Sequence, residues 1–208
     1  MKKIDKFLLE KINKKLKLNK NINLPILSKG QVLVKMIFTS LCGSQIMEIS
    51  GKRGKDKYLP HGLGHEGLAK VIEIGPGVKK IKKNDKVILS WIKSKGCDCK
   101  GFKIKINKNR FINFGPITTL SNYSIVSENR CVKKPKKLND KTAAFFGCSI
   151  ATGFGVVYNS IKKPKKKSIG IYGLGTVGLF SLIAAKCLNF KKIFVIEKNI
   201  TKKILAKK

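Results

Sequence analysis

The chain has 208 residues with 42% hydrophobic content, and its 46 Lys and Arg residues against 11 Asp and Glu residues give a net charge of +35. This length can bury a hydrophobic core and indicates one or two domains. No apolar run reaches the roughly 18 residues of a membrane span, and the charged segment at 1–11 lacks the apolar centre of a secretory signal. We therefore expect a cytoplasmic protein that has no membrane partner.

The positive charge suggests nucleic-acid binding, because a strongly basic chain adheres to polyanions at low salt. However, Arg53, Arg110 and Arg130 are the only arginines, and base recognition depends largely on the planar guanidinium group. The lysine runs at 133–137 and 162–167 contain no aromatic residue. We interpret the lysines as a solvated surface that reflects codon bias, and we expect no specific nucleic-acid partner. A lysine-rich nucleic-acid binder remains the alternative.

The first 150 residues have the pattern of short strands separated by glycine turns. Apolar alternation predicts strands at 31–40, 68–74, 86–91 and, as a pair of strands, 122–132. An irregular, frayed segment is expected between Ile12 and Leu27, and the signal between Ile92 and Leu120 is weak. Asp140 is expected to cap a short helix.

A different pattern begins near residue 168. A short apolar strand at 168–172 leads into a glycine-rich turn and a helix, and a second apolar run ends in Glu197, 24 positions after Gly173. In a strand–turn–helix–strand unit, the glycine backbone and the helix N-terminus can receive a pyrophosphate, and the acid can bind a ribose diol. The candidate cofactor-binding residues are Gly173, Gly175, Thr176, Val177, Gly178 and Glu197. A glycine turn in an ordinary parallel unit is the alternative.

These patterns predict a β-rich domain at 1–150 and part of a dinucleotide-binding domain at 151–208. After Glu197 only the beginning of a second helix is expected, at 199–208. Two parallel strands cannot cover their own apolar faces. We therefore expect a sequence that is truncated at its C-terminus.

Cysteines and histidines provide candidate metal ligands. The chain has six cysteines, for which metal ligation, catalysis or burial as a free thiol is likelier in a reducing compartment than disulfide formation. Separations of 23 residues from Cys42 to His65 and of 83 residues from His65 to Cys148 are too long to indicate a zinc site by spacing alone.

Ordered motifs between about residues 30 and 208 resemble the zinc-dependent medium-chain alcohol dehydrogenases. They are Cys42-Gly43-Ser44, Gly64-His65-Glu66-Gly67, Gly75-Pro76-Gly77-Val78 with Asn84-Asp85-Lys86-Val87, the segment 147–155, and the glycine-rich turn 173–178. The resemblance implies an α+β then α/β fold, with a chaperonin-10-like β domain followed by the first βαβ unit of a Rossmann domain. It also implies a hydride-transferring oxidoreductase that acts on a small alcohol or aldehyde and, when full-length, forms homo-oligomers.

The resemblance assigns one catalytic zinc to Cys42, His65 and Cys148, a ligand set that leaves one position open for a substrate oxygen. Bound zinc lowers the pKa of water from 15.7 to about 7, and a bound alcohol should respond similarly. Ser44 would then pass the alcohol proton outward. Glu66 would lie next to the zinc, and Thr152 would pack on the nicotinamide. Glu197 favours NAD, because a carboxylate repels the 2′-phosphate of NADP.

The sequence departs from the family at two supporting positions. Gln45 replaces an aspartate that supports the zinc-bound imidazole; a glutamine can still accept that hydrogen bond, but losing such a partner costs about 10–100-fold in metal affinity or activity. Met47 replaces a relay histidine and cannot carry a proton. The cysteines of the structural-zinc lobe are reduced to Cys97 and Cys99, so a second zinc is not expected there, and His61 is expected to be a loop residue. A non-catalytic zinc- or nucleotide-binding module remains the alternative function.

Overall fold

The structure is a computed structural model that describes residues 3–107 and 110–207 and divides into two units, Met1–Gly147 and Cys148–Lys208. Met1 and Lys2, in the predicted charged N-terminus, and Lys208, in the predicted last helix, lie outside the described residues. Among the described residues, no helix is both long and apolar enough to cross a bilayer.

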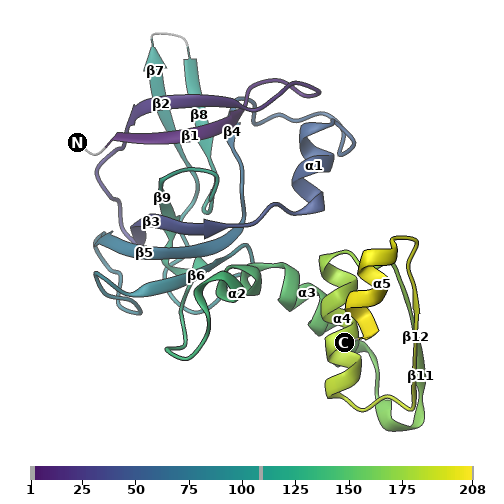
Figure 1. The fold of residues 1–208 in the computed structure, drawn as a ribbon. Helices are drawn as coiled ribbons and strands as arrows, with labels where there is room; N and C mark the ends of the chain where they lie inside the picture. The colour runs from purple at the N-terminus through teal and green to yellow at the C-terminus, as the bar shows by residue number, and fades with distance from the viewer. Residues whose placement is uncertain (1–2, 108–109, 208) are drawn as a thin grey trace. The chain divides into compact units, whose positions relative to one another are not determined.

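The first unit contains two five-stranded sheets (Figure 1). One sheet has the order β2-β1-β4-β8-β7 and consists of β1 (Lys3–Leu9), β2 (Lys17–Asn23), β4 (His61–Gly62), β7 (Phe102–Asn107) and β8 (Arg110–Phe114). The other has the order β10-β6-β5-β3-β9 and consists of β3 (Gln31–Thr39), β5 (Glu66–Ile74), β6 (Lys86–Ser90), β9 (Tyr123–Ser127) and β10 (Cys131–Lys133).

Both faces of the second sheet are buried, which explains the nearly continuous apolar runs of its central strands. On β3, Leu33 packs with Ile112 and Phe114 of the first sheet, whereas Val32 and Val34 pack into a second cluster on the opposite face. The strands predicted at 31–40, 68–74 and 86–91 are thus confirmed as β3, β5 and β6.

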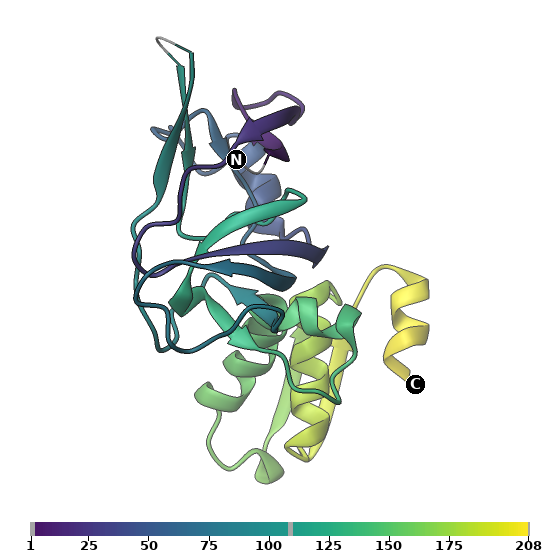
Figure 2. The same ribbon diagram turned by 90° about the vertical axis from the view of Figure 1, so that its left-hand side faces the viewer.

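The structure corrects the prediction for the N-terminal segment and assigns strands to residues 92–120, where the sequence signal is weak. The segment expected to be frayed contributes β2, which pairs with β1, and residues 102–114 form the β7–β8 hairpin (Figure 2). In β2 only Leu18 and Ile22 are apolar, so its pattern is too weak to indicate a strand, whereas β7 does alternate, with Phe102, Ile104 and Ile106 separated by lysines. These strands form because they pair with neighbours and cover the core.

Two further predictions were wrong in detail. β9 and β10 do not pair with each other, because the 3-10 turn Glu128–Arg130 sends them to opposite edges of their sheet. The short helix α2 (Asp140–Ala143) is capped by Asn139, whose side-chain oxygen accepts hydrogen bonds from the backbone of Lys141 and Thr142, and not by Asp140. The helix continues as a 3-10 turn to Gly147.

The second unit contains one parallel strand pair and three helices. β11 (Ser168–Tyr172) pairs in register with β12 (Lys192–Ile196), and α4 (Thr176–Cys187) connects them. The helix α3 (Ser149–Ser160) packs on α4, and α5 (Ile200–Lys207) follows β12. One face of the pair is covered by α3 and α4, whereas Tyr172 and Phe194 on the other face are 83% and 56% exposed. Parallel strands normally have both faces covered.

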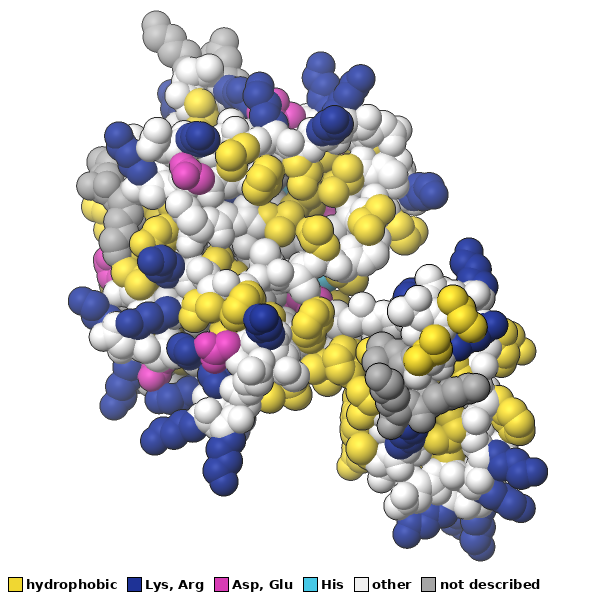
Figure 3. All heavy atoms as spheres, viewed as in Figure 1, with side chains coloured by type: hydrophobic (Ala, Val, Ile, Leu, Met, Phe, Trp, Pro, Cys, Tyr) yellow, Lys and Arg dark blue, Asp and Glu magenta, His cyan; other side chains and the backbone are white. Residues whose placement is uncertain are grey.

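Lysine and arginine side chains are scattered over the face shown in Figure 3 and do not gather into a single patch. Apolar side chains lie between them on both units. On this face, the distribution agrees with the solvated lysine surface that the composition predicts.

Candidate metal centre and glycine-rich turn

The structure brings the three predicted zinc ligands together. The sulfur atoms of Cys42 and Cys148 and a ring nitrogen of His65 all lie within 4.8 Å of one another. Two thiols and one imidazole are a donor set that zinc uses in catalytic sites, where a fourth position stays open.

Cys42 and His65 are held at the ends of strands of the first unit. Cys42 lies between β3 and the helix α1 (Gly43–Ile49), and it is the residue immediately before that helix. His65 lies between β4 and β5, where backbone hydrogen bonds from Thr119 to Gly64 and from Leu120 to Leu63 fix the preceding loop. Both residues therefore sit on segments whose backbone is constrained by the sheets.

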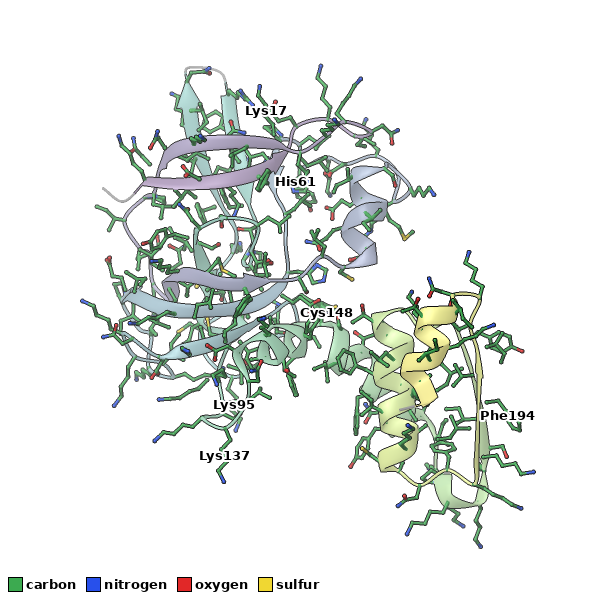
Figure 4. All side chains as sticks on the ribbon, viewed as in Figure 1. Lys17, His61, Lys95, Lys137, Cys148 and Phe194 are labelled. Carbon is green, nitrogen blue, oxygen red and sulfur yellow. The ribbon has the colours of Figure 1, made fainter. Side chains whose placement is uncertain are left out.

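Cys148 is positioned through its peptide bond to Gly147, the last residue of the first unit. The Gly147 carbonyl accepts a hydrogen bond of 2.6 Å from Ser90 Oγ. A Cβ atom at Gly147 would lie only 2.0 Å from the Leu89 carbonyl oxygen, so only glycine permits this close approach to β6. Figure 4 shows Cys148 at the start of α3, where the residue is 8% exposed.

His65 carries the observation that most directly fits a metal. Its Nε2 atom is buried and has no hydrogen-bond partner among the described residues. A buried ring nitrogen without a partner is costly unless a ligand satisfies it. Burial also lowers the pKa of His65, with the nearby Glu66 and Glu48 carboxylates opposing this effect, so the neutral, metal-binding form is favoured at neutral pH. The residues present thus fit zinc.

Gln45 does not take over the role of the aspartate. The Gln45 side-chain oxygen instead accepts a hydrogen bond of 2.8 Å from the Cys42 backbone N–H, as a cap on the first turn of α1. Its Nε2 atom is buried and has no partner among the described residues. The glutamine side chain is long enough to reach the N–H group at the start of its own helix. Its oxygen is therefore bonded to the backbone and not to His65.

The other predicted residues around the thiols lie on three different segments. Ser44 is a half-buried residue of the first turn of α1, and Met47 on the same helix is 47% exposed. Glu66 is fully buried at the start of β5, and its Cβ lies beside Gly147. Thr152 is exposed on α3, with its hydroxyl 4.0 Å from Cys148 Sγ.

The glycine-rich turn connects β11 with α4 as predicted. Gly173 adopts a φ of +84°, which favours glycine, and Gly175 precedes α4 with open space where a side chain would stand. Glu197 accepts hydrogen bonds from the backbone N–H of Leu174 (2.5 Å) and Asn199 (2.9 Å). These bonds hold the pKa of Glu197 below its usual range. The bare backbone at the start of α4 and the ionised acid fit a dinucleotide.

We expect Gly178→Ala to destabilise this turn. A Cβ atom at Gly178 would lie 2.0 Å from the Gly173 carbonyl oxygen, so the helix must move away from the strand at a cost of about 1–3 kcal/mol. Urea unfolding followed by hydrogen exchange in β11, β12 and α4 measures this cost. Gly155→Ala on α3 is the matched control, because its nearest contact is at 3.5 Å. Equal stability of the two variants would contradict the packing role of Gly178.

The remaining cysteines do not join the candidate metal centre. Cys97 and Cys99 are half-buried and donate to the carbonyls of Gly77 and Lys29, and Cys131 is fully buried. Burial raises the pKa of the Cys131 thiol to about 12. Cys187 is exposed at the end of α4.

Residues 28–136 match the family model of the alcohol dehydrogenase GroES-like domain. The chain belongs to this family. The solved structure of benzyl alcohol dehydrogenase from Acinetobacter calcoaceticus is similar, with a TM-score of 0.82 and 25% identity over 100% of this chain and 62% of that chain. The predicted fold class, a chaperonin-10-like β domain followed by the first βαβ unit of a Rossmann domain, is confirmed.

Curated relatives of this GroES-like chain include two S-(hydroxymethyl)glutathione dehydrogenases. The protein from Photobacterium damsela subsp. piscicida is 32% identical and the one from Escherichia coli strain SMS-3-5 is 28% identical, each over 86% of this chain and 55% of the relative. The chain therefore spans about half the length of the curated relatives that it matches.

The GroES-like unit contains a cavity of about 670 Å³ beside the metal centre. Its wall includes Gln45, His65, Phe114 and Thr118, so the cavity reaches the candidate zinc ligand from within the first unit. A cavity of this size can hold a small molecule.

Sequence reasoning missed a second group of polar residues, of which Glu48 and His61 line the same cavity. His61 is not in a loop but on the two-residue strand β4, where it is 8% exposed and bonded to Asp56. Glu48 on α1 completes the group. Glu48 and Asp56 are eight residues apart, and Asp56 and His61 are five apart, which matches no known motif of metal ligands. The only feature of the sequence that points to this group is the rarity of acidic residues in the chain.

Proposed function

We propose that this protein is a zinc-dependent oxidoreductase that transfers a hydride between a small alcohol or aldehyde and NAD. The observation that carries the proposal is the convergence of Cys42, His65 and Cys148, with the Nε2 atom of His65 buried and without a partner. The glycine-rich turn with Glu197 supports the assignment of the nucleotide.

The proposed roles follow from the donor set and the positions of the side chains. When bound, zinc would supply a Lewis acid for the substrate oxygen, and NAD a hydride acceptor. Cys42, His65 and Cys148 would hold the zinc. Thr152 would contact the nicotinamide, and the turn at 173–178 with the N-terminus of α4 would bind the pyrophosphate.

The route for the alcohol proton is short in this chain. Ser44, on the first turn of α1, would receive the proton from the substrate hydroxyl and pass it to water or a cofactor hydroxyl. The thioether of Met47 has no proton to exchange, so the relay cannot continue along α1. Glu66 would balance the positive charge of the metal centre from the start of β5, next to His65.

The test is to measure zinc per chain and alcohol-dependent reduction of NAD with the whole protein. We expect one zinc at the thiolate centre and turnover that a chelator abolishes and added zinc restores. Zinc binding without any alcohol-dependent reduction of NAD would instead support a non-catalytic zinc- or nucleotide-binding module.

We expect Glu197→Gln to weaken discrimination between NAD and NADP. The glutamine removes the negative charge that repels a 2′-phosphate and keeps one of the two acceptor oxygens that bond the backbone N–H groups of Leu174 and Asn199. A change of about 1.4 kcal/mol corresponds to a tenfold change in the ratio of the two kcat/KM values, and we expect at least this change. A protein that prefers NADP with Glu197 intact would contradict the role of this acid.

A further inference from the structure

Glu48, Asp56 and His61 converge in the first unit, apart from the two thiols. Their ligand atoms all lie within 4.8 Å of one another. His61 Nε2 is 2.8 Å from Asp56 Oδ2 and 3.7 Å from Glu48 Oε1. Figure 4 labels His61 within the first unit, and α1 supplies Glu48.

Both ring nitrogens of His61 face oxygen acceptors. Nδ1 lies 3.0 Å from the Gly62 carbonyl oxygen, and Nε2 lies 2.8 Å from the Asp56 carboxylate. A neutral imidazole has one N–H donor, so it can satisfy only one of these contacts, and its other nitrogen would place a lone pair against an oxygen. In the tautomer that donates Nδ1–H to the Gly62 carbonyl, Nε2 presents its lone pair toward the Asp56 and Glu48 oxygens, which is the arrangement that binds a cation.

Each of the three side chains has one atom anchored and one atom directed at the common centre. Asp56 Oδ1 accepts a hydrogen bond of 2.8 Å from the Tyr58 backbone, and Glu48 Oε2 lies 4.0 Å from the Arg53 guanidinium. The other oxygen of each carboxylate faces His61 Nε2, while the Gly62 carbonyl orients the ring through Nδ1. Metal-ligating histidines and carboxylates are commonly oriented in this way.

The group is protected from the basic surface. The side chains of His61 and Asp56 are 10% and 11% exposed, and that of Glu48 is 28% exposed. Although 46 of the 208 residues are basic, no described lysine forms an ion pair with Asp56 or Glu48. The nearby Lys57 lies over the Tyr58 ring instead, with its Nζ 5.4 Å from the centroid. Among the described residues, Asp56 thus has no lysine or arginine ion-pair partner, and Glu48 has only Arg53, at 4.0 Å.

We propose that Glu48, Asp56 and His61 form a second divalent-cation site, suited to Zn²⁺ or a similar ion. Zinc accepts one imidazole nitrogen and two carboxylate oxygens at about 2.0–2.2 Å, which places tetrahedral ligands about 3.4 Å apart. The distances from His61 Nε2 to Asp56 Oδ2 (2.8 Å) and to Glu48 Oε1 (3.7 Å) lie on either side of this value. Because Glu48 and His61 line the cavity that His65 also lines, an ion there would add positive charge to the cavity wall. This site does not depend on the proposed oxidoreductase activity.

The test is a titration of the full chain with Zn²⁺ and, in parallel, with Co²⁺, whose bonds to thiolates absorb in the near ultraviolet. We expect two ions per chain, of which only the one at the cysteines contributes thiolate absorption. Asp56→Asn and His61→Gln should weaken the second ion at least about tenfold and leave the thiolate absorption unchanged. Asp56→Asn preserves the shape of the side chain, so it keeps the test valid if His61→Gln unfolds.

Two control variants separate this site from other cation binding. Glu73→Gln, which removes an exposed carboxylate of β5, should still bind two ions. Cys148→Ala should lose the thiolate absorption and retain the second ion, so failure at the cysteines is distinguishable from failure at His61. Identical binding by the wild type and Asp56→Asn would overturn the proposal, because the three side chains would then hold no ion.

Discussion

Cys148→Ala should weaken the binding of zinc at Cys42 and His65 more than about 100-fold. The substitution leaves two protein ligands, whereas catalytic zinc sites use three, and removing even a partner of a ligand costs about 10–100-fold in affinity. Competition with a chromogenic chelator measures the loss. In the whole protein, turnover should disappear together with the metal.

Cys187→Ala is the matched control for this experiment. Cys187 is exposed at the end of α4, so its removal should change neither zinc affinity nor stability. Thermal unfolding of the two variants without metal shows whether any loss reflects misfolding, because the alanine at 148 removes one buried sulfur. Equal zinc affinity in the two variants would contradict the assignment of Cys148 as a ligand.

Lys6 should make the stability of the first unit depend on pH above neutrality. Its side chain is fully buried on β1, where Nζ donates to the carbonyl and hydroxyl of Thr118 and to Ser121 Oγ. The ammonium also lies 5.2 Å from the centre of the Phe114 ring. Burial lowers the pKa of Lys6 to about 7, from the model-compound value of 10.5.

Between pH 7 and about 10, the folded state then holds Lys6 neutral while the unfolded chain holds it protonated, so unfolding takes up a proton. The free energy of unfolding should therefore rise by about 1.4 kcal/mol per pH unit from pH 7 upward, and this contribution is absent below pH 7, where both states are protonated. Urea unfolding at pH 7, 8 and 9 measures the slope.

Lys6→Met should abolish this pH dependence, because the methionine has no proton to bind. Lys20→Met on β2 is the control, since Lys20 is exposed and its removal should leave the slope unchanged. Comparison of the variants cancels the titration of the other groups. A slope in Lys6→Met equal to that of the wild type would show that Lys6 is protonated in the folded protein.

The local sequence was sufficient for the elements with strong periodic patterns. The central strands β3, β5 and β6 are apolar on both faces, and the turn between β11 and α4 requires glycine for its backbone angle and its close packing. Such features depend on neighbouring residues in the chain. β1 and β2 escaped prediction because lysines interrupt their pattern, and Lys6 itself is buried through hydrogen bonds to residues more than 100 positions away.

By itself, the sequence determined the two-part architecture, through strand periodicity followed by a strand–glycine turn–helix–strand unit. It also placed Cys42, His65 and Cys148 as candidate ligands, although their spacing carried no zinc signal and only the resemblance to a family connected them. Tertiary structure alone decided that Gln45 caps its own helix and that His61 lies between Asp56 and Glu48. The cap is a local contact between residues three apart, and the structure decides only that it prevails over a bond to His65. The second outcome depends on which atoms meet after the sheets have packed, and residue identity along the chain does not encode those distances.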